Sequence, residues 1–292
     1  MGLRRRPTPG RADAGTVLRL AVLLQAGVAP ADAWRYLAEA GDAAAAAVAT
    51  RLAAGDDVPS AIETLPGWGD VAAAWRIAET VGAPLAESLR GIAAALQDAA
   101  RTRDEVRIAL AEPAGTARLM AWLPLVAVAL GAALGFDTLQ TLVTDPIGIA
   151  CAAGGVGLIL AAHRWNRRLV RRADPDEAVA GLGADLMAIA LSGGASLERA
   201  SRLVAATGAG EPDAETRGIL TLSHSAGVPA AELLRAAAGL ARHRARTEGR
   251  LRAARLSSSL LVPLGVCTLP AFLLLGVAPM LLSVLSTTPL SL

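Results

Sequence analysis

Two aspartates stand close together in the sequence, and a pair of carboxylates can perform acid–base chemistry. Asp137 and Asp145 lie in one short connection between two apolar stretches. Membrane aspartyl peptidases need two carboxylates that share one site and hold different protonation states. No Gly-x-Gly-Asp context surrounds either residue. We therefore favour the interpretation that each aspartate caps a helix end at a membrane edge, with the peptidase pair as the minor alternative.

The other reactive side chains are too scattered to predict a site. His163, His224 and His243 have no partner at metal-ligand spacing. Cys151 and Cys267 lie in apolar runs and are interpreted as small hydrophobic residues. The chain contains no lysine, which excludes both a Gly-x-x-x-x-Gly-Lys-Ser/Thr phosphate loop and lysine Schiff-base chemistry. We expect a protein that is not an enzyme and that binds no cofactor or metal.

Charged residues at predicted helix starts are the better candidates for function. The segment ETVGAPLAESLR occupies residues 79–90, and the similar segment HSAGVPAAELLR occupies residues 224–235. In each, a glycine can end one helix and a proline can begin the next. The glutamate after each proline would lie in a first helical turn, where negative charge is favourable; contact with a partner protein is the alternative role. The candidate interface residues are Glu79, Gly82, Glu87, Arg90, Glu232 and Arg235.

A run of arginines between residues 242 and 255 could bind nucleic acid, anionic lipid or an acidic protein face. No aromatic residues are interleaved with these arginines, and an apolar run follows them directly. We therefore assign them to lipid headgroups and membrane topology, and we expect no nucleic acid partner.

The elements that carry these residues are predicted to be helices. Apolar residues make up 53% of the chain and aromatic residues only 3%, with alanine and leucine, both strong helix formers, dominating. Three stretches without charge, at 119–136, 146–162 and about 256–285, approach the ~20 residues that cross a bilayer as a helix. Arginines flank the same side of all three, so the positive-inside rule places the amino terminus inside and the carboxyl terminus outside.

The predicted organisation is an all-α, multi-pass protein of the cytoplasmic (inner) membrane with two related cytoplasmic helical bundles and about three transmembrane helices. In order, we expect a flexible basic tail (1–14), a first bundle (15–116), a transmembrane hairpin (117–162), a second, shortened bundle (163–255), a third span (256–285) and an outside tail (286–292).

The two bundles are predicted to be copies of one pattern. The offset is 145 residues between Gly82 and Gly227, and 167 residues between Gly27 and Gly194 farther upstream. The second copy is thus 22 residues shorter, and its missing part corresponds roughly to the helices around residues 48–68. In copy one, turn signals predict helices at about 16–26, 30–40, 42–54, 57–65 and 69–81, followed by a long helix from 84.

The repeated unit, LLQAGVAPADAW … RLAAGDDVPSAIETLP … AETVGAPLAESLRGIAAAL, resembles the type II secretion F domain. The closing run PLGVCTLPAFLLLGVAP, residues 263–279, is similar to the end of the TadC-type branch, which serves Flp (tight-adherence) pili. The resemblance covers residues 16–285. It implies six-helix modules in a membrane platform that binds a hexameric assembly ATPase, pilin subunits, membrane lipids, and a second F-domain protein or itself. Residues 211–213 of copy two read as a loop, so its agreement with the full six-helix module is left open.

Two other functions would place different demands on the sequence. A membrane subunit of a small transporter or export complex would be expected to place charged residues inside its spans, and these spans contain none. A signalling protein with helical linkers would be expected to carry a receiver or catalytic module, and no such module is recognisable in the sequence.

Overall fold

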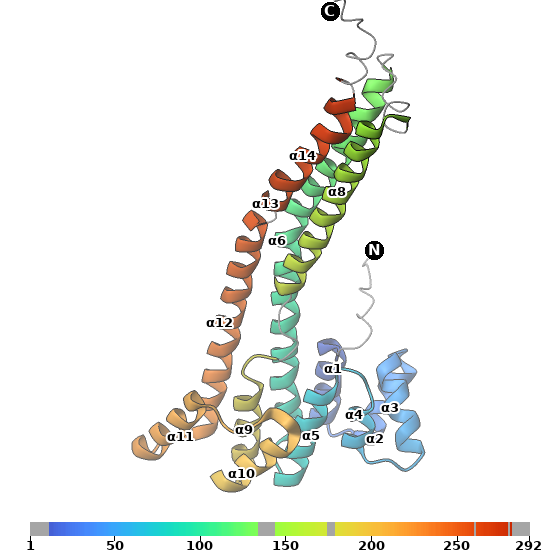
Figure 1. The fold of residues 1–292 in the computed structure, drawn as a ribbon. Helices are drawn as coiled ribbons and strands as arrows, with labels where there is room; N and C mark the ends of the chain where they lie inside the picture. Colours follow the sequence, from blue (N-terminus) through green and yellow to red (C-terminus); the bar gives the residue numbers. More distant parts are fainter. Residues whose placement is uncertain (1–11, 134–143, 174–178, 260, 280, 282–292) are drawn as a thin grey trace, which may run out of the picture. The chain divides into compact units, whose positions relative to one another are not determined.

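The protein is described by a computed structural model that covers residues 12–133, 144–173, 179–259, 261–279 and 281 (Figure 1). All regular elements in these residues are helices, which confirms the all-α prediction. The chain divides into two compact units: the first comprises residues 1–102 and 177–246, and the second comprises residues 103–176 and 247–292. Two long helices, α6 (Leu85–Ala133) and α12 (Ala230–Ser259), contribute residues to both units.

Copy one forms five short helices ahead of α6. They are α1 (Ala14–Gln25), α2 (Pro30–Glu39), α3 (Ala43–Ala53), α4 (Val58–Glu63) and α5 (Gly69–Val81). The starts of α1, α3 and α4 are fixed by Asp13, Asp42 and Asp57, whose carboxylates accept hydrogen bonds from first-turn N–H groups. The predicted bounds agree with the observed ones within the one or two residues by which helix ends are ordinarily defined.

Three buried tryptophans hold α2 against α5. The Trp34 ring lies 6.0 Å from the Trp68 ring and 6.4 Å from the Trp75 ring, measured between centroids. Trp34 belongs to α2, Trp75 belongs to α5, and Trp68 is the N-cap of α5. Large aromatic side chains dominate the energetics of a core, so this cluster fixes the centre of copy one.

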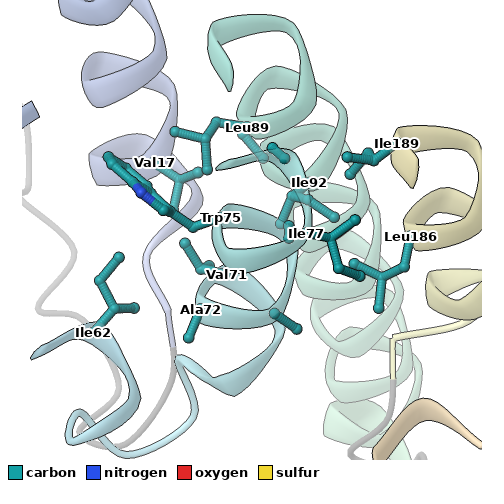
Figure 2. Packing of buried hydrophobic residues seen from close by; sticks show 14 of the residues in the cluster. Val17, Ile62, Val71, Ala72, Trp75, Ile77, Leu89, Ile92, Leu186 and Ile189 are labelled. Carbon is teal, nitrogen blue, oxygen red and sulfur yellow. The ribbon is translucent and has the colours of Figure 1, made fainter. Parts of the chain in front are cut away.

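Helix α5 is buried on two sides because it also contacts α9 (Leu182–Ser192) of copy two. Figure 2 shows Trp75 lying toward Val17 of α1, whereas Ile77 lies toward Leu186 of α9. All four side chains are almost completely buried. The two copies therefore share one hydrophobic core in the first unit.

Glycines allow α9 to approach its neighbours at backbone distance. A Cβ atom built on Gly193, the C-cap of α9, would lie 2.3 Å from Cγ2 and 2.8 Å from the carbonyl oxygen of Val81. A Cβ atom on Gly181, the N-cap, would lie 2.8 Å from Cα of Ala238 in α12. No other residue type fits these contacts without displacing a helix.

Copy two consists of α9, α10 (Leu197–Val204), α11 (Ala214–Ala226) and α12, with a π-helical turn at Ala205–Ala209. Residues 210–213 form a loop, as predicted. Within residues 179–259 no helix occupies the sequence position of α3 or α4. Gly27 and Gly194, which the predicted repeat aligns, are both left-handed, with φ of 84° and 82°; the repeat itself stays a prediction.

The second unit contains α8 (Pro146–Ala173) and the carboxyl-terminal helical segments, which pack against it. A Cβ atom on Gly155 would lie 2.5 Å from Cγ of Leu275, and one on Gly154 would lie 3.5 Å from Cδ1 of Leu274. Gly155 therefore carries the closest contact, whereas nothing lies within 4 Å of a Cβ atom built on Gly157.

Prolines explain the irregular carboxyl-terminal segments, which are α13 (Leu261–Pro263), a π-helical turn at Leu264–Thr268, α14 (Leu269–Phe272) and a second π-helical turn at Leu273–Val277. A proline ring clashes with the carbonyl group four residues earlier. Each π-helical turn contains the residue four positions before a proline: Val266 lies four residues before Pro270, and Leu275 lies four residues before Pro279. The wider turn relieves the clash and keeps the segment helical.

In the part of the chain that the structure describes, one helical stretch, Pro146–Leu169, is long and apolar enough to cross a membrane. It contains the second predicted span. Its predicted cap is confirmed, because the Ile147 N–H donates a hydrogen bond of 3.1 Å to Oδ1 of Asp145. Asp137, residues 1–11 of the predicted basic tail and the predicted outside tail 286–292 fall outside the described residues, and the three-span count and orientation stay predictions.

Candidate functional site

The two copies of the glycine–proline motif place the starts of α6 and α12 in the same local geometry. Gly82 ends α5 with φ 72° and Gly227 ends α11 with φ 66°, both in the left-handed region. Their N–H groups donate to the carbonyl groups of Ala78 and Ser223. Glycine is favoured at such a C-cap because it lacks a Cβ atom. Each cap reverses the chain so that the next helix begins within three residues.

The structure brings three of the predicted interface residues together in the first unit. Arg235 of α12 donates to Glu232 at 2.5 Å and lies 3.1 Å from Oε1 of Glu87 in α6. The side chains of Glu87 and Glu232 are more than half exposed. One arginine thus faces two carboxylates, and the group presents a net negative charge to solvent where α6 and α12 begin. Both glutamates lie in first helical turns, as the electrostatic interpretation predicts.

The other predicted residues lie nearby with different surroundings. Arg90 of α6 donates a hydrogen bond to Oε1 of Gln25, the last residue of α1. Glu79 is exposed near the end of α5, and no hydrogen bond or ion pair joins it to any described residue. Its carboxylate is therefore available to a partner. Arg90 is engaged in holding α1 against α6.

A buried ion pair in the same unit was not predicted. Arg242 Nη1 of α12 lies 2.6 Å from Oδ2 of Asp185 in α9, and the two side chains are only 16% and 10% exposed. Arg242 Nε lies 3.6 Å from Oδ2 of Asp98 in α6 and makes no hydrogen bond. Arg242 therefore joins three helices. Burial raises the pKa of Asp185, and the positive charge of Arg242 opposes this rise.

The assignment of residues 242–255 to lipid headgroups needs correction at Arg242, which is held in the protein core. Arg244 and Arg252 form surface ion pairs, at 3.0 Å with Glu215 and at 3.2 Å with Glu248. The sequence signal for Arg242 was Asp185, an acid in the otherwise apolar helix LGADLMAIALS. A buried acid requires a cation nearby. Asp185 alone therefore predicts that one of the arginines of residues 242–255 pairs with it inside the protein and does not contact lipid.

A cavity of about 600 Å³ lies between α5 and copy two in the first unit. Its charged lining residues are Glu63, Asp70, Arg76, Glu211, Asp213 and Glu215. Most of them already have partners: Glu63 pairs with Arg76 at 2.7 Å, Glu215 pairs with Arg244, and Asp213 caps α11. Burial raises the pKa of Asp70. The described residues hold no group of three His, Cys, Asp or Glu side chains that could bind a metal ion.

These features define an all-helical scaffold with a charged surface at the start of its two long helices. Residues 17–132 match the family model described as Type II secretion system (T2SS), protein F. The match covers α1 to α5 and nearly all of α6, which is less than half of the chain. No curated protein matches the chain. A type II secretion F domain is thus present at residues 17–132.

Proposed function

We propose that this protein is an inner-membrane platform component of the TadC-type branch, which couples a hexameric cytoplasmic ATPase to pilin assembly or protein secretion. The observation that supports the proposal most directly is the F domain at residues 17–132, whose last helix, α6, continues without interruption to Ala133. An α-helix rises 1.5 Å per residue, so the 49 residues of α6 extend over about 73 Å. The same helix therefore contains both Glu87 and most of the first predicted span, residues 119–136.

The coupling would be a rigid-body movement of the first unit passed into α6 and α12. In that unit the two helices run parallel, because Glu87 pairs with Arg235 and, farther along both helices, Asp98 lies beside Arg242. In the second unit, Glu105 pairs with Arg250 at 2.8 Å. Ion pairs at successive levels let the two helices move together, which is the behaviour expected of a transmitting element.

The exposed carboxylates at the start of α6 and α12 are the proposed contact for the ATPase. Glu79 has no partner among the described residues, and the group formed by Glu87, Arg235 and Glu232 carries an excess negative charge. A basic surface on the partner would complement this charge. Charge complementarity of this kind raises the association rate more than it raises the affinity.

The test is co-purification of the full chain in detergent with the assembly ATPase of its own cell. A Glu79→Arg variant should fold normally, because Glu79 is exposed and contributes little to folding. It should lose the ATPase, because the substitution reverses the charge at the proposed contact. A Glu39→Arg variant is the matched control, since Glu39 is also exposed and lies in the last turn of α2. If Glu79→Arg retains as much ATPase as Glu39→Arg, the contact does not lie at the end of α5.

The ion pair can be tested separately by exchanging its charges. A Glu87→Arg/Glu232→Arg/Arg235→Glu variant keeps opposite-charge pairs around position 235 but changes the net charge of the group from negative to positive. We expect it to fold like the wild type and to bind the ATPase less well. Absence of the ATPase even from the wild type, under conditions that preserve other membrane complexes, would favour the transporter interpretation instead.

The proposed topology has its own test. In a background without Cys151 and Cys267, Thr144→Cys should react with a membrane-impermeant maleimide added outside the cytoplasmic membrane, and Glu198→Cys should not. Thr144 lies two residues before the start of α8, and Glu198 is exposed on α10. Equal labelling of both positions in intact cells would contradict the three-span arrangement.

A further inference from the structure

The cavity of about 600 Å³ between α5 and copy two lies entirely within the first unit. Its volume falls in the range of about 300–1,000 Å³ that is usual for ligand sites in proteins. Part of its lining is apolar, because Val179, Leu186 and Met187 are buried there. The charged part of the lining consists of five carboxylate side chains and one arginine. A ligand that combines positive charge with an aliphatic stem fits such a lining.

Three of the five carboxylates already have their charge balanced. Glu63 pairs with Arg76 at 2.7 Å, and Glu215 pairs with Arg244 at 3.0 Å. Asp213 caps α11, and the positive charge of an arginine in the same helix acts on it. These three side chains therefore need no further cation.

The other two carboxylates, Asp70 and Glu211, have no such balance. Neither side chain forms a hydrogen bond or an ion pair with any described residue. Asp70 is half-buried in the first turn of α5, and burial raises its pKa. Glu211 is exposed in the loop that precedes α11. Both line the same cavity, so one short basic segment can contact the two of them.

The amino-terminal segment of the chain has the composition that this cavity requires. Residues 1–11 read MGLRRRPTPGR, with four arginines and no acidic residue. The arginine side chain joins a charged head to an apolar stem, and its guanidinium group can bind a carboxylate through two parallel hydrogen bonds. The segment thus complements both the acidic and the apolar parts of the lining.

The described chain also begins beside the cavity. The Ala12 N–H donates a hydrogen bond of 3.2 Å to the carbonyl oxygen of Gly67. Gly67 lies two residues before Gly69, which lines the cavity together with Asp70. The run Arg4 to Arg6 lies six to eight residues before Ala12, and that length of chain spans up to about 20–29 Å when extended. A compact cavity of this volume is only roughly 10 Å across, so the three arginines can reach it.

We propose that the arginine-rich amino-terminal segment binds in this cavity of its own chain, where Arg4 to Arg6 pair with Asp70 and Glu211. A short flexible tether holds a ligand at an effective concentration on the order of 1 mM, which favours the segment of the same chain over that of another copy in dilute solution. The bound segment bridges copy one, through Asp70, and copy two, through Glu211. The proposal requires no ATPase, and its failure would leave the co-purification result unaffected.

The reactivity of a cysteine placed in the cavity tests the proposal. In a background with Cys151→Ala and Cys267→Ala, Ala206→Cys supplies a thiol at an exposed position of the lining. Its labelling rate with a maleimide is measured on the purified full chain in detergent. The substitutions Arg4→Gln/Arg5→Gln/Arg6→Gln should raise this rate by about 5-fold, the factor expected when two partly exposed ion pairs are lost.

Two matched controls accompany this comparison. Thr221→Cys is exposed on α11 outside the cavity, and its labelling rate should not depend on the arginines. The substitutions Arg4→Lys/Arg5→Lys/Arg6→Lys keep the positive charge and should keep the labelling of Ala206→Cys slow.

The direction of the change separates uncovering of the thiol from electrostatics. A nearby positive charge lowers the pKa of a thiol and increases the fraction of reactive thiolate. If the arginines lay near the cysteine without covering it, their removal would slow the labelling. Faster labelling of the glutamine variant therefore indicates that the segment covered the cavity.

Exchange of the charges identifies the carboxylates. The substitutions Arg4→Glu/Arg5→Glu/Arg6→Glu should also speed the labelling of Ala206→Cys, and Asp70→Arg/Glu211→Arg in the same chain should slow it again. Urea unfolding followed by tryptophan fluorescence shows whether each variant folds. If Asp70→Arg does not fold, Asp70→Asn/Glu211→Gln in the chain with the natural segment is the second variant, and it should speed the labelling.

Two results would overturn the proposal. Equal labelling rates of Ala206→Cys with arginine and with glutamine at positions 4–6 would show that the segment does not occupy the cavity, and would leave it to a basic segment of another protein. The third arm adds chains that carry the three arginines but no cysteine to the glutamine variant. Slower labelling in this mixture would assign the cavity to the segment of a second copy.

Discussion

Arg242 and Asp185 form one ion pair but have different surroundings, so we predict different stability costs for replacing each of them. Arg242 has a second carboxylate nearby, Asp98 at 3.6 Å, whereas among the described residues Asp185 forms an ion pair with Arg242 alone. Burial raises the pKa of Asp185 despite the nearby cation. We therefore expect Arg242→Met to destabilise the protein far more than Asp185→Asn does.

The magnitudes follow from the geometry. At an effective dielectric constant of about 20, unit charges about 4 Å apart attract each other by about 4 kcal/mol. Arg242→Met removes this attraction and leaves a buried carboxylate, which typically costs about 3–5 kcal/mol of folding free energy. In Asp185→Asn, the amide oxygen can still accept from Arg242 and Asp98 still lies near its charge, so we expect a loss of about 1 kcal/mol. The double variant Arg242→Met/Asp185→Leu should be close to the wild type.

Urea unfolding of the full chain in detergent, followed by tryptophan fluorescence, measures these differences. Trp34, Trp68 and Trp75 are buried in the first unit and report its unfolding. Arg244→Met is the matched control on the same helix, because its pair with Glu215 is about half exposed and should contribute less than about 1 kcal/mol.

The same pair predicts a pH dependence. A carboxyl group whose folded pKa lies above its unfolded value destabilises the fold progressively as pH rises from the unfolded pKa through the folded pKa. Removal of Arg242 raises the pKa of Asp185 further, so the deficit of Arg242→Met should be larger at about pH 8 than at about pH 5. Equal costs for Arg242→Met and Asp185→Asn, or a deficit that does not change with pH, would refute the reasoning.

Three further predictions concern local contacts. Gly193→Val should lower the unfolding free energy by about 1–3 kcal/mol in the same assay, because its side chain would collide with the Val81 backbone. Asp213→Ala should cost about 1 kcal/mol at neutral pH by removing the α11 cap. Hydrogen bonds from Thr216 lower the pKa of Asp213, so this stabilisation is present above the ordinary pKa and is lost as pH falls through the lowered value; both proteins should therefore converge in acid. Gly155→Val should lower the melting temperature in detergent by separating α8 from Leu275, whereas Gly157→Val, which faces open space, should do so much less.

The helix bounds of copy one were predictable because local chemistry determines them. Asp42 and Asp57 start helices by accepting hydrogen bonds within their own first turns, and Gly82 ends one through its own backbone conformation. No distant residue is needed for these effects. The same locality explains why the charged first turns of α6 and α12 were found from the sequence.

The contacts between helices were not predictable from the same signals. Gly193 resembles Ala26 in the repeat, and only the packing of α9 on α5 shows that a methyl group would not fit. Arg242 belongs to a run of arginines in which one member folds inward and others remain on the surface. A single sequence does not distinguish such members, because each has the same local context.

The two close glycine contacts of α9 also determine how the first unit can move. Gly193 brings α9 against the α5 backbone, and Gly181 brings it against the α12 backbone. Neither contact has clearance for one methyl group, so any residue larger than glycine would push α9 away from α5 or α12. Closely packed interiors transmit strain between neighbouring elements, and α9 is the element through which a displacement of α5 would reach α12 within the first unit.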